Sequence, residues 1–224
     1  MTLLPMTLWT ALAGAEHPEF LPIEDDPALP RVLLLGDSIS VGYTLPVRAK
    51  LAGEANVHRP QENCGPTSRG VERLDTWLGD GEWDVIHFNF GLHDLKIMDD
   101  GEHQVPIEQY EENLEQMVVK LKQTGAEVVW ASTTPVPDPV GGPTRRPDDV
   151  IAYNQVAEAI MFEHSIAIDD LYAFALPQLS KIQLPADVHF SPEGSEVLAR
   201  QVSESIRQAL STRKGHVVYL EDVL

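Results

Sequence analysis

The sequence predicts an α/β fold, a single three-layer α/β/α domain with a mostly parallel sheet of about five strands. Short apolar runs of strand length alternate along the chain with longer segments of helical periodicity. The strand candidates are almost wholly apolar, as expected when helices cover both faces of a parallel sheet. A length of 224 residues suits one domain of ordinary size.

The predicted strands are short runs that end at a turn-forming residue. Arg31–Leu35 (RVLLL) is stopped by Gly36, and the run at 83–90 (WDVIHFNF) is stopped by Gly91. The run at 55–59 has the weakest strand pattern of the five. The predicted strands, in order, are residues 31–35, 55–59, 83–90, 127–132 and 165–169.

The predicted helices follow these strands. The segment 106–124 is the clearest, because Pro106 suits a first helical position and Gly125 a stop. In the segment 41–51, Pro46 is expected only near the first turn. The predicted helices, in order, are residues 41–51, 69–78, 106–124, 148–164 and 191–210.

Two further helix starts carry capping signals. Asp148 or Asp149 is expected to cap the helix at 148–164. Ser191, Pro192 and Glu193 read as the cap, the first position and the acidic first turn of the closing helix. These signals predict where the last two helices begin.

The remaining segments suggest how the chain is organised. Residues 1–15 end in Ala-Gly-Ala and read either as a secretory signal peptide or as an apolar N-terminal arm, so the protein is expected to be secreted or periplasmic, or otherwise cytoplasmic. Residues 16–30 read as an extended lead-in, 31–210 as the domain and 211–224 as a C-terminal tail that could dock on it. The loop 133–147, with five prolines and two glycines, is a candidate rim of a binding site.

Composition excludes several functional classes. With 35 acidic residues against 16 Lys and Arg, the formal charge is −19, which argues against nucleic acid and anionic membranes as partners. The single cysteine, Cys64, excludes an intramolecular disulfide framework and a multi-cysteine zinc site. No segment is long enough to span a bilayer as a helix.

Chemically capable side chains lie just after the predicted strands. Ligands of such sheets bind at the carboxyl ends of the strands. Ser38 follows the first strand through Gly36, and Gly91-Leu92-His93-Asp94 follows the third. Asp187-Val188-His189 stands just before the closing helix. This topology would therefore bring a serine, a histidine and a carboxylate together.

Ser38 and His189 have the chemistry of a nucleophile and its base. A hydroxyl at a helix start lies where the helix dipole favours an oxyanion, although Ser38 could instead merely cap the helix. A neutral His189 imidazole could take the serine proton if a carboxylate fixed its tautomer. Asp187 lies two residues earlier, and two extended residues span about 6.6 Å and return side chains to one face.

The order of these blocks resembles that of the SGNH (GDSL-type) hydrolases. The resemblance spans about residues 31–210 and implies a flavodoxin-like α/β/α fold and a serine esterase without a metal or organic cofactor. It implies that Ser38 is the nucleophile, that His189 is the base, and that the backbone N–H groups of Ser38 and Gly65 contribute to the oxyanion hole. The four matching blocks are Gly36-Asp37-Ser38, Gly65-Pro66-Thr67-Ser68, Gly91-Leu92-His93-Asp94 and Asp187-Val188-His189.

The sequence departs from the pattern of this family at the oxyanion donor. The third block usually carries Asn, and His93 holds that position here. An imidazole N–H can also donate to an oxyanion, so His93 is the expected donor. Asn89 is the alternative, but its place in the strand pattern favours a buried amide with its hydrogen bonds satisfied.

The second departure is the acid. The family usually separates Asp and His by two residues, but here Ala186 occupies that position and Asp187 is one place closer to His189. Either a reshaped turn lets Asp187 serve, or another group orients the imidazole. Asp169 and Asp170, at the end of the last predicted strand, are the other candidates.

The resulting functional hypothesis is hydrolysis of a small acyl ester, with acetyl expected, on a small molecule or a carbohydrate. The alternative is a non-catalytic carbohydrate-binding or interaction domain that keeps the fold. A Cys–His hydrolase built on Cys64 lacks a neighbouring base, and a metal-dependent phosphohydrolase lacks an Asp/His cluster. The sequence leaves the natural ester and the oligomeric state open.

Overall fold

A five-stranded parallel sheet forms the centre of the molecule. The computed structural model describes residues 17–137 and 145–221, and for 214–221 the backbone only. The strand order is β2-β1-β3-β4-β5, and every pairing is parallel, which confirms the predicted fold class. The strands are β1 Arg31–Leu35, β2 Asn56–His58, β3 Val85–Phe88, β4 Glu127–Ala131 and β5 Ala167–Asp169.

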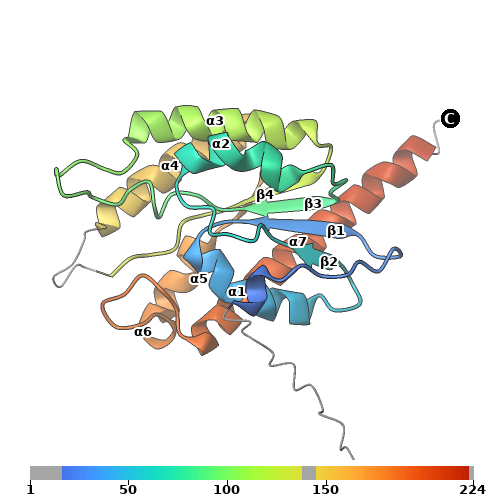
Figure 1. Ribbon diagram of the computed structural model, residues 1–224, viewed down its shortest axis with the longest axis horizontal. Helices are drawn as coiled ribbons and strands as arrows, with labels where there is room; N and C mark the ends of the chain where they lie inside the picture. Colours follow the sequence, from blue (N-terminus) through green and yellow to red (C-terminus); the bar gives the residue numbers. More distant parts are fainter. Residues whose placement is uncertain (1–16, 138–144, 222–224) are drawn as a thin grey trace, which may run out of the picture.

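Helices cover both faces of this sheet. Figure 1 shows α2, α3 and α4 on one face and α1 and α7 on the other, and α5 and α6 contact α7. The α-helices are α1 Ser38–Lys50, α2 Thr67–Leu78, α3 Ile107–Gln123, α4 Pro147–Glu163, α5 Leu171–Ala175, α6 Leu179–Ile182 and α7 Pro192–Glu221. Two short 3₁₀ turns, η1 Pro18–Phe20 and η2 Leu176–Gln178, complete the described elements.

The apolar strands form the core because both of their faces are covered. Leu34, Phe88 and Trp130, on the three central strands, are fully buried. Burying side chains of this size contributes about 1.5–3 kcal/mol each. The continuous apolar character of the strands is therefore what fixes the layered fold.

The order of the strands indicates the edge of the sheet at which a ligand is expected to bind. The chain passes from β1 outward to β2, then returns to place β3 on the other side of β1. At such a reversal of strand order, the loops that follow the two adjacent strands β1 and β3 turn away from each other. Ligands of parallel sheets bind between such loops, at the carboxyl ends of the strands. The loops after β1 and β3 carry Ser38 and His93.

The expectation for Pro46 is wrong. The helix begins at Ser38 rather than at residue 41, so Pro46 lies in its interior. Proline there leaves the carbonyl of residue 42 without its helical donor. Gly42 is exposed, so water can satisfy that carbonyl, and the helix continues to Lys50.

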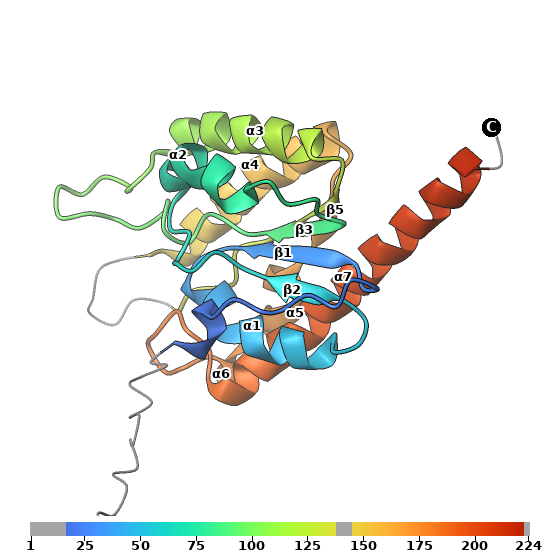
Figure 2. The ribbon, with the colours of Figure 1, turned by 45° about the vertical axis from the view of Figure 1, so that its right-hand side comes forward.

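The last two long helices, α4 and α7, also differ from the sequence prediction. Neither Asp148 nor Asp149 caps α4, because Pro147 takes a first-turn position and moves both acids into the first turn. The closing helix α7 does not end at residue 210 but continues to Glu221, so most of the predicted tail is helical. Figure 2 shows its last turns extending beyond the sheet rather than docking on it.

The lead-in packs on the domain. The Asn56 side chain accepts a hydrogen bond from the Asp26 N–H (3.0 Å) and donates to the carbonyls of Asp26 (2.9 Å) and Leu29 (3.1 Å). The predicted N-terminal segment 1–15 and the loop residues 138–144 lie outside the described residues. Among the helices described, none combines the length and the apolar character needed to cross a membrane.

Candidate active site

A hydrogen-bonded line of three side chains lies at the carboxyl edge of the sheet. The Oγ of Ser38 is 2.8 Å from the Nε2 of His189, and the Nδ1 of His189 is 2.7 Å from the Oδ1 of Asp187. The first residue belongs to the start of α1 and the other two to the loop before α7. The structure thus brings Ser38 together with a pair of residues that lies about 150 positions later in the sequence.

The turn after β1 leaves the Ser38 hydroxyl free. A Cβ at Gly36 would lie 2.7 Å from the Cβ of Ser40, so this tight turn requires glycine. Asp37 is the N-cap of α1, because its Oδ1 accepts the Ile39 N–H at 2.9 Å. Ser38 therefore does not cap the helix, and its Oγ can point to His189.

A reshaped turn lets Asp187 reach His189. Pro185 and Ala186 form the corner, with Ala186 in the left-handed region at φ 54°, and the Asp187 N–H donates to the Leu184 carbonyl at 3.2 Å. Asp187 Oδ1 then accepts both the backbone N–H (2.9 Å) and the Nδ1 of His189. The backbone N–H of His189 is the main cause of the lowered pKa of Asp187, so the carboxylate stays ionised.

The other two candidate acids are engaged elsewhere. Asp169 is buried and lies 2.9 Å from the Nε2 of His87, while its other oxygen accepts from Gln201 at 2.9 Å. Asp170 caps α5 and accepts from the Ser132 hydroxyl at 3.0 Å. Neither has a hydrogen bond to His189 among the described residues.

The predicted oxyanion loop holds Gly65 in the left-handed region, at φ 64°. Its N–H donates to the Asn63 side-chain oxygen at 2.9 Å. A substrate oxygen would have to replace Asn63 as the acceptor. Sequence reasoning missed this contact, although an Asx turn is a common role for Asn two residues before Gly.

His93 and Asn89 have different surroundings. His93 is partly exposed, and burial is the main cause of its lowered pKa. The negative charge of Asp37 raises this pKa, and the positive charge of Arg145 lowers it further. The imidazole is therefore neutral near pH 7, with one N–H to donate. The amide of Asn89 is buried and donates to the Ala131 carbonyl at 2.7 Å. Asn89 is thus a satisfied interior amide, as its place in the strand pattern indicated.

A buried polar network, which the sequence did not reveal, braces the loop that carries His93. The Asp94 carboxylate accepts the Thr67 N–H at 2.8 Å and the Thr67 hydroxyl at 2.5 Å. The Asn113 amide donates to the same hydroxyl at 3.1 Å. The network joins the start of α2 to the loop after β3, so it fixes Gly65 and His93 relative to each other.

Asp94 should make stability depend on pH. Burial raises its pKa from 3.8 to about 6, because the buried carboxyl is harder to ionise than the carboxyl of the unfolded chain. Its contribution to stability is therefore complete below pH 3.8 and is lost as pH rises through 6. The free energy of unfolding of the wild type, minus that of Asp94→Asn, should fall by about 1–3 kcal/mol between pH 4 and about pH 7.5. Urea unfolding of both proteins at the two pH values measures this difference. The exposed Asp75→Asn variant is the control, and an equal difference at both pH values would contradict the expectation.

Cys64 is buried beside the oxyanion loop and forms no disulfide. Burial raises its pKa to about 12, so the thiolate needed for nucleophilic attack does not form near neutral pH.

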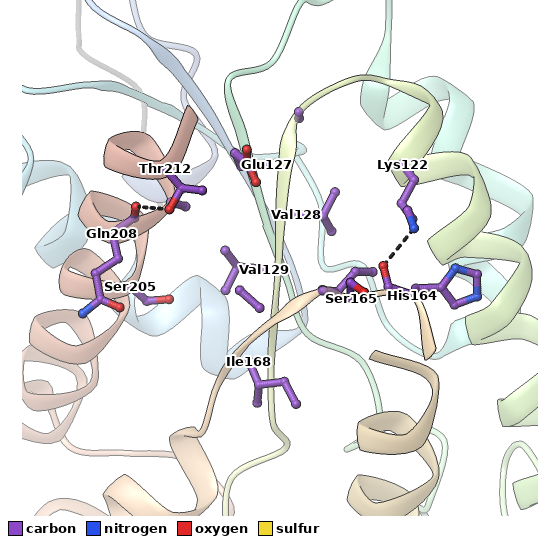
Figure 3. A pocket seen from close by; sticks show the side chains of 14 residues that line it. Lys122, Glu127, Val128, Val129, His164, Ser165, Ile168, Ser205, Gln208 and Thr212 are labelled. Carbon is purple, nitrogen blue, oxygen red and sulfur yellow. Dashed lines mark hydrogen bonds between the residues drawn. The ribbon is translucent and has the colours of Figure 1, made fainter. Parts of the chain in front are cut away.

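A cavity of about 560 Å³ lies away from these residues. It opens at the amino ends of β4 and β5, the sheet edge opposite Ser38. Figure 3 shows Ser205, Gln208 and Thr212 of α7 on one side of it, and Lys122 and His164 on the other. No hydrogen-bonded nucleophile and base lie among its lining residues, so this cavity is not the candidate active site.

Comparisons with known proteins agree with this geometry. The sequence model of the GDSL-like lipase/acylhydrolase family matches residues 34–197. The acetyl xylan esterase AlAXEase has a TM-score of 0.68 at 14% identity, covering 79% of this chain and 99% of its own. The lipase/acylhydrolase from Enterococcus faecalis has a TM-score of 0.67 at 23% identity, covering 80% of this chain and 96% of its own.

A third solved structure gives the same result. Axe2, an acetylxylan esterase from Geobacillus stearothermophilus, has a TM-score of 0.65 at 18% identity, covering 79% of this chain and 94% of its own. At these identities the likenesses show the fold. No curated protein matches the chain.

Proposed function

Because the chain belongs to the GDSL-like lipase/acylhydrolase family and is a carboxylic ester hydrolase, we propose that it removes a small acyl group, acetyl, from a carbohydrate ester. The reaction proceeds through an acyl-enzyme on Ser38. The observation that carries the proposal is the line of hydrogen bonds from Ser38 through His189 to Asp187. This line also favours an enzyme over a non-catalytic domain that merely keeps the fold.

The proposed reaction has two steps. Ser38 Oγ attacks the acyl carbonyl while its proton passes to Nε2 of His189, and Asp187 stabilises the imidazolium. The proton then goes to the alcohol oxygen, which leaves, and the acyl group stays on Ser38. Water, deprotonated by His189, attacks the acyl-enzyme and releases the acid. The N–H groups of Ser38 and Gly65, with His93, stabilise the oxyanion in both steps.

The acetyl group of the proposal rests on the similar structures rather than on a cavity. A void of about 10 Å³ is lined by Ile39, Tyr43, Leu92 and Leu171, but neither Ser38 nor His189 lines it, so it does not set the acyl length. The acetyl xylan esterases among the similar structures support a carbohydrate as the alcohol part.

Acyl-length selectivity tests this proposal. We expect kcat/KM for p-nitrophenyl acetate to exceed that for the butyrate and octanoate esters by about tenfold or more, because a site that holds an acetyl group closely has no room for the added methylenes. Acetate release from acetylated xylo-oligosaccharides, measured alongside, tests the carbohydrate part. Faster hydrolysis of octanoate than of acetate would contradict a small acyl group.

His93 should contribute to kcat rather than to substrate binding. Removing one oxyanion donor costs about 10²–10³ in kcat, so His93→Ala should lower kcat by this factor with KM nearly unchanged. His93→Asn, which restores an amide donor, should recover part of the loss. Asn89→Ala is the comparison, and it should lower the melting temperature and leave kcat per folded molecule near that of the wild type. A kcat loss only in Asn89→Ala would mean that Asn89 is the donor.

A further inference from the structure

Arg59 is a buried cation next to the proposed oxyanion hole. It follows β2 directly, and 7% of the residue is exposed. Arginine is almost never buried this deeply without specific partners. The mechanism proposed above does not use Arg59, so its role has to be inferred from the groups that its guanidinium contacts.

The guanidinium joins three parts of the site. It reaches two hydroxyls on the first two turns of α1, the carbonyl of the turn that carries Ser38, and two carbonyls of the loop that leads to Gly65. The distances are 3.2 Å to Ser40 Oγ, 2.8 Å to Thr44 Oγ1, 3.4 Å to the Gly36 carbonyl, 3.3 Å to the Pro60 carbonyl and 3.4 Å to the Glu62 carbonyl.

Two other contacts complete its surroundings. The Phe20 ring of η1 covers the guanidinium carbon at 5.2 Å. The charge of Arg59 is attracted to the carboxylate of Asp37, which is buried and whose Oδ2 has no hydrogen-bond partner among the described residues. Without Arg59, this negative charge beside Ser38 would lose a compensating cation and would oppose an oxyanion.

These contacts matter because the oxyanion donors lie on separate segments. The N–H of Ser38 belongs to α1 and that of Gly65 to the loop before α2. The two must point at one oxygen atom. One backbone hydrogen bond joins these segments directly, from the Cys64 N–H to the Gly36 carbonyl at 3.2 Å. Arg59 adds a planar, multiply bonded link between them, a geometry that a lysine cannot reproduce.

We infer that Arg59 is a positioning residue that holds the Ser38 turn and the Gly65 loop at the separation an oxyanion requires. This inference rests on the proposed function. Arg59 does not touch the substrate. It acts through the two segments that carry the donors, so its loss should weaken binding of the transition state more than binding of the ester.

The test compares Arg59→Met with a matched arginine. Arg48 is partly buried and also bonds backbone carbonyls, those of Val57 at 3.0 Å and Leu21 at 3.4 Å. It lies in the last turn of α1, and neither carbonyl belongs to the Ser38 turn or to the Gly65 loop. Both methionine variants keep the apolar part of the side chain. For each we would measure kcat and KM on p-nitrophenyl acetate, the inhibition constant of phenylboronic acid as a tetrahedral mimic, and the melting temperature.

We expect Arg59→Met to lower kcat by about 10–100-fold with KM within about threefold, because small displacements of catalytic groups cost factors of this size. Phenylboronic acid should bind more weakly by about the same factor. Arg48→Met should lower the melting temperature while kcat stays within about threefold of the wild type. Arg59→Lys, which keeps the charge without the planar fork, should fall between Arg59→Met and the wild type.

Two results would overturn the inference. One is a folded Arg59→Met whose kcat and phenylboronic acid affinity both stay within threefold of the wild type. The other is an equal loss of kcat in Arg48→Met. If Arg59→Met does not fold, Arg59→Lys decides, and wild-type kcat in that variant overturns the inference. Failure of the proposed function is distinguishable, because Ser38→Ala would then keep its activity whatever Arg59 does.

Discussion

Ser38→Ala should lower kcat for p-nitrophenyl acetate by about 10³–10⁶, because only the oxyanion hole and substrate binding would remain to accelerate the reaction. The fold should persist. Asp37 caps α1, so alanine at position 38 removes one partly exposed hydrogen bond and no cap. That change costs about 1 kcal/mol, which corresponds to a few degrees in melting temperature.

Covalent labelling by a fluorophosphonate probe tests independently whether Ser38 is the nucleophile. Wild type should label, and Ser38→Ala should not. Ser191→Ala is the matched control, since its hydroxyl also lies at a helix start and accepts the Gly194 N–H at 3.0 Å. Loss of that cap should reduce stability by about 1 kcal/mol without reducing kcat. A Ser38→Ala variant with a tenth of wild-type activity, or with equal labelling, would place the nucleophile elsewhere.

The sequence predicted the fold and the meeting of Ser38 with His189 because both depend on local patterns. An apolar run such as Arg31–Leu35 predicts a doubly covered strand, and Gly36 marks where it ends. In a parallel sheet the segments after such strands meet at one edge, so strand ends alone bring Ser38 toward the loop after β3. His189 lies in the loop before α7, and its meeting with Ser38 was predicted from the order of the four blocks.

The details that the sequence could not supply depend on single conformations. Ala186 adopts a left-handed conformation, which favours glycine, and only this turn brings Asp187 to the ring of His189. The Gly65 N–H donates to the Asn63 side chain, and this contact too depends on the conformation of one short turn. Arg59 lies in a weak strand pattern with no motif around it, and its importance follows from three segments that meet only in the fold.

Asp187→Asn should lower kcat by about 10²–10⁴ with little change in KM. An amide at this position can donate to Nδ1 of His189, and the ring then carries its proton on Nε2, where it cannot accept the proton of Ser38. The side chain of Asp187 is 47% exposed, so water partly replaces it, and the loss should lie toward the lower end of this range. Steady-state kinetics on p-nitrophenyl acetate from pH 5 to about pH 9 measure the effect.

Asp170→Asn separates this role from a general loss of stability. Asp170 also accepts a backbone N–H, that of Ala173 at 3.0 Å, but it has no bond to His189. Its substitution should lower the melting temperature and leave kcat near the wild-type value. If Asp187→Asn instead keeps kcat within threefold, the carboxylate does not orient His189. Ser38 and His189 would then act as a dyad, and the lowered pKa of Asp187 would reflect only the turn that the His189 N–H closes.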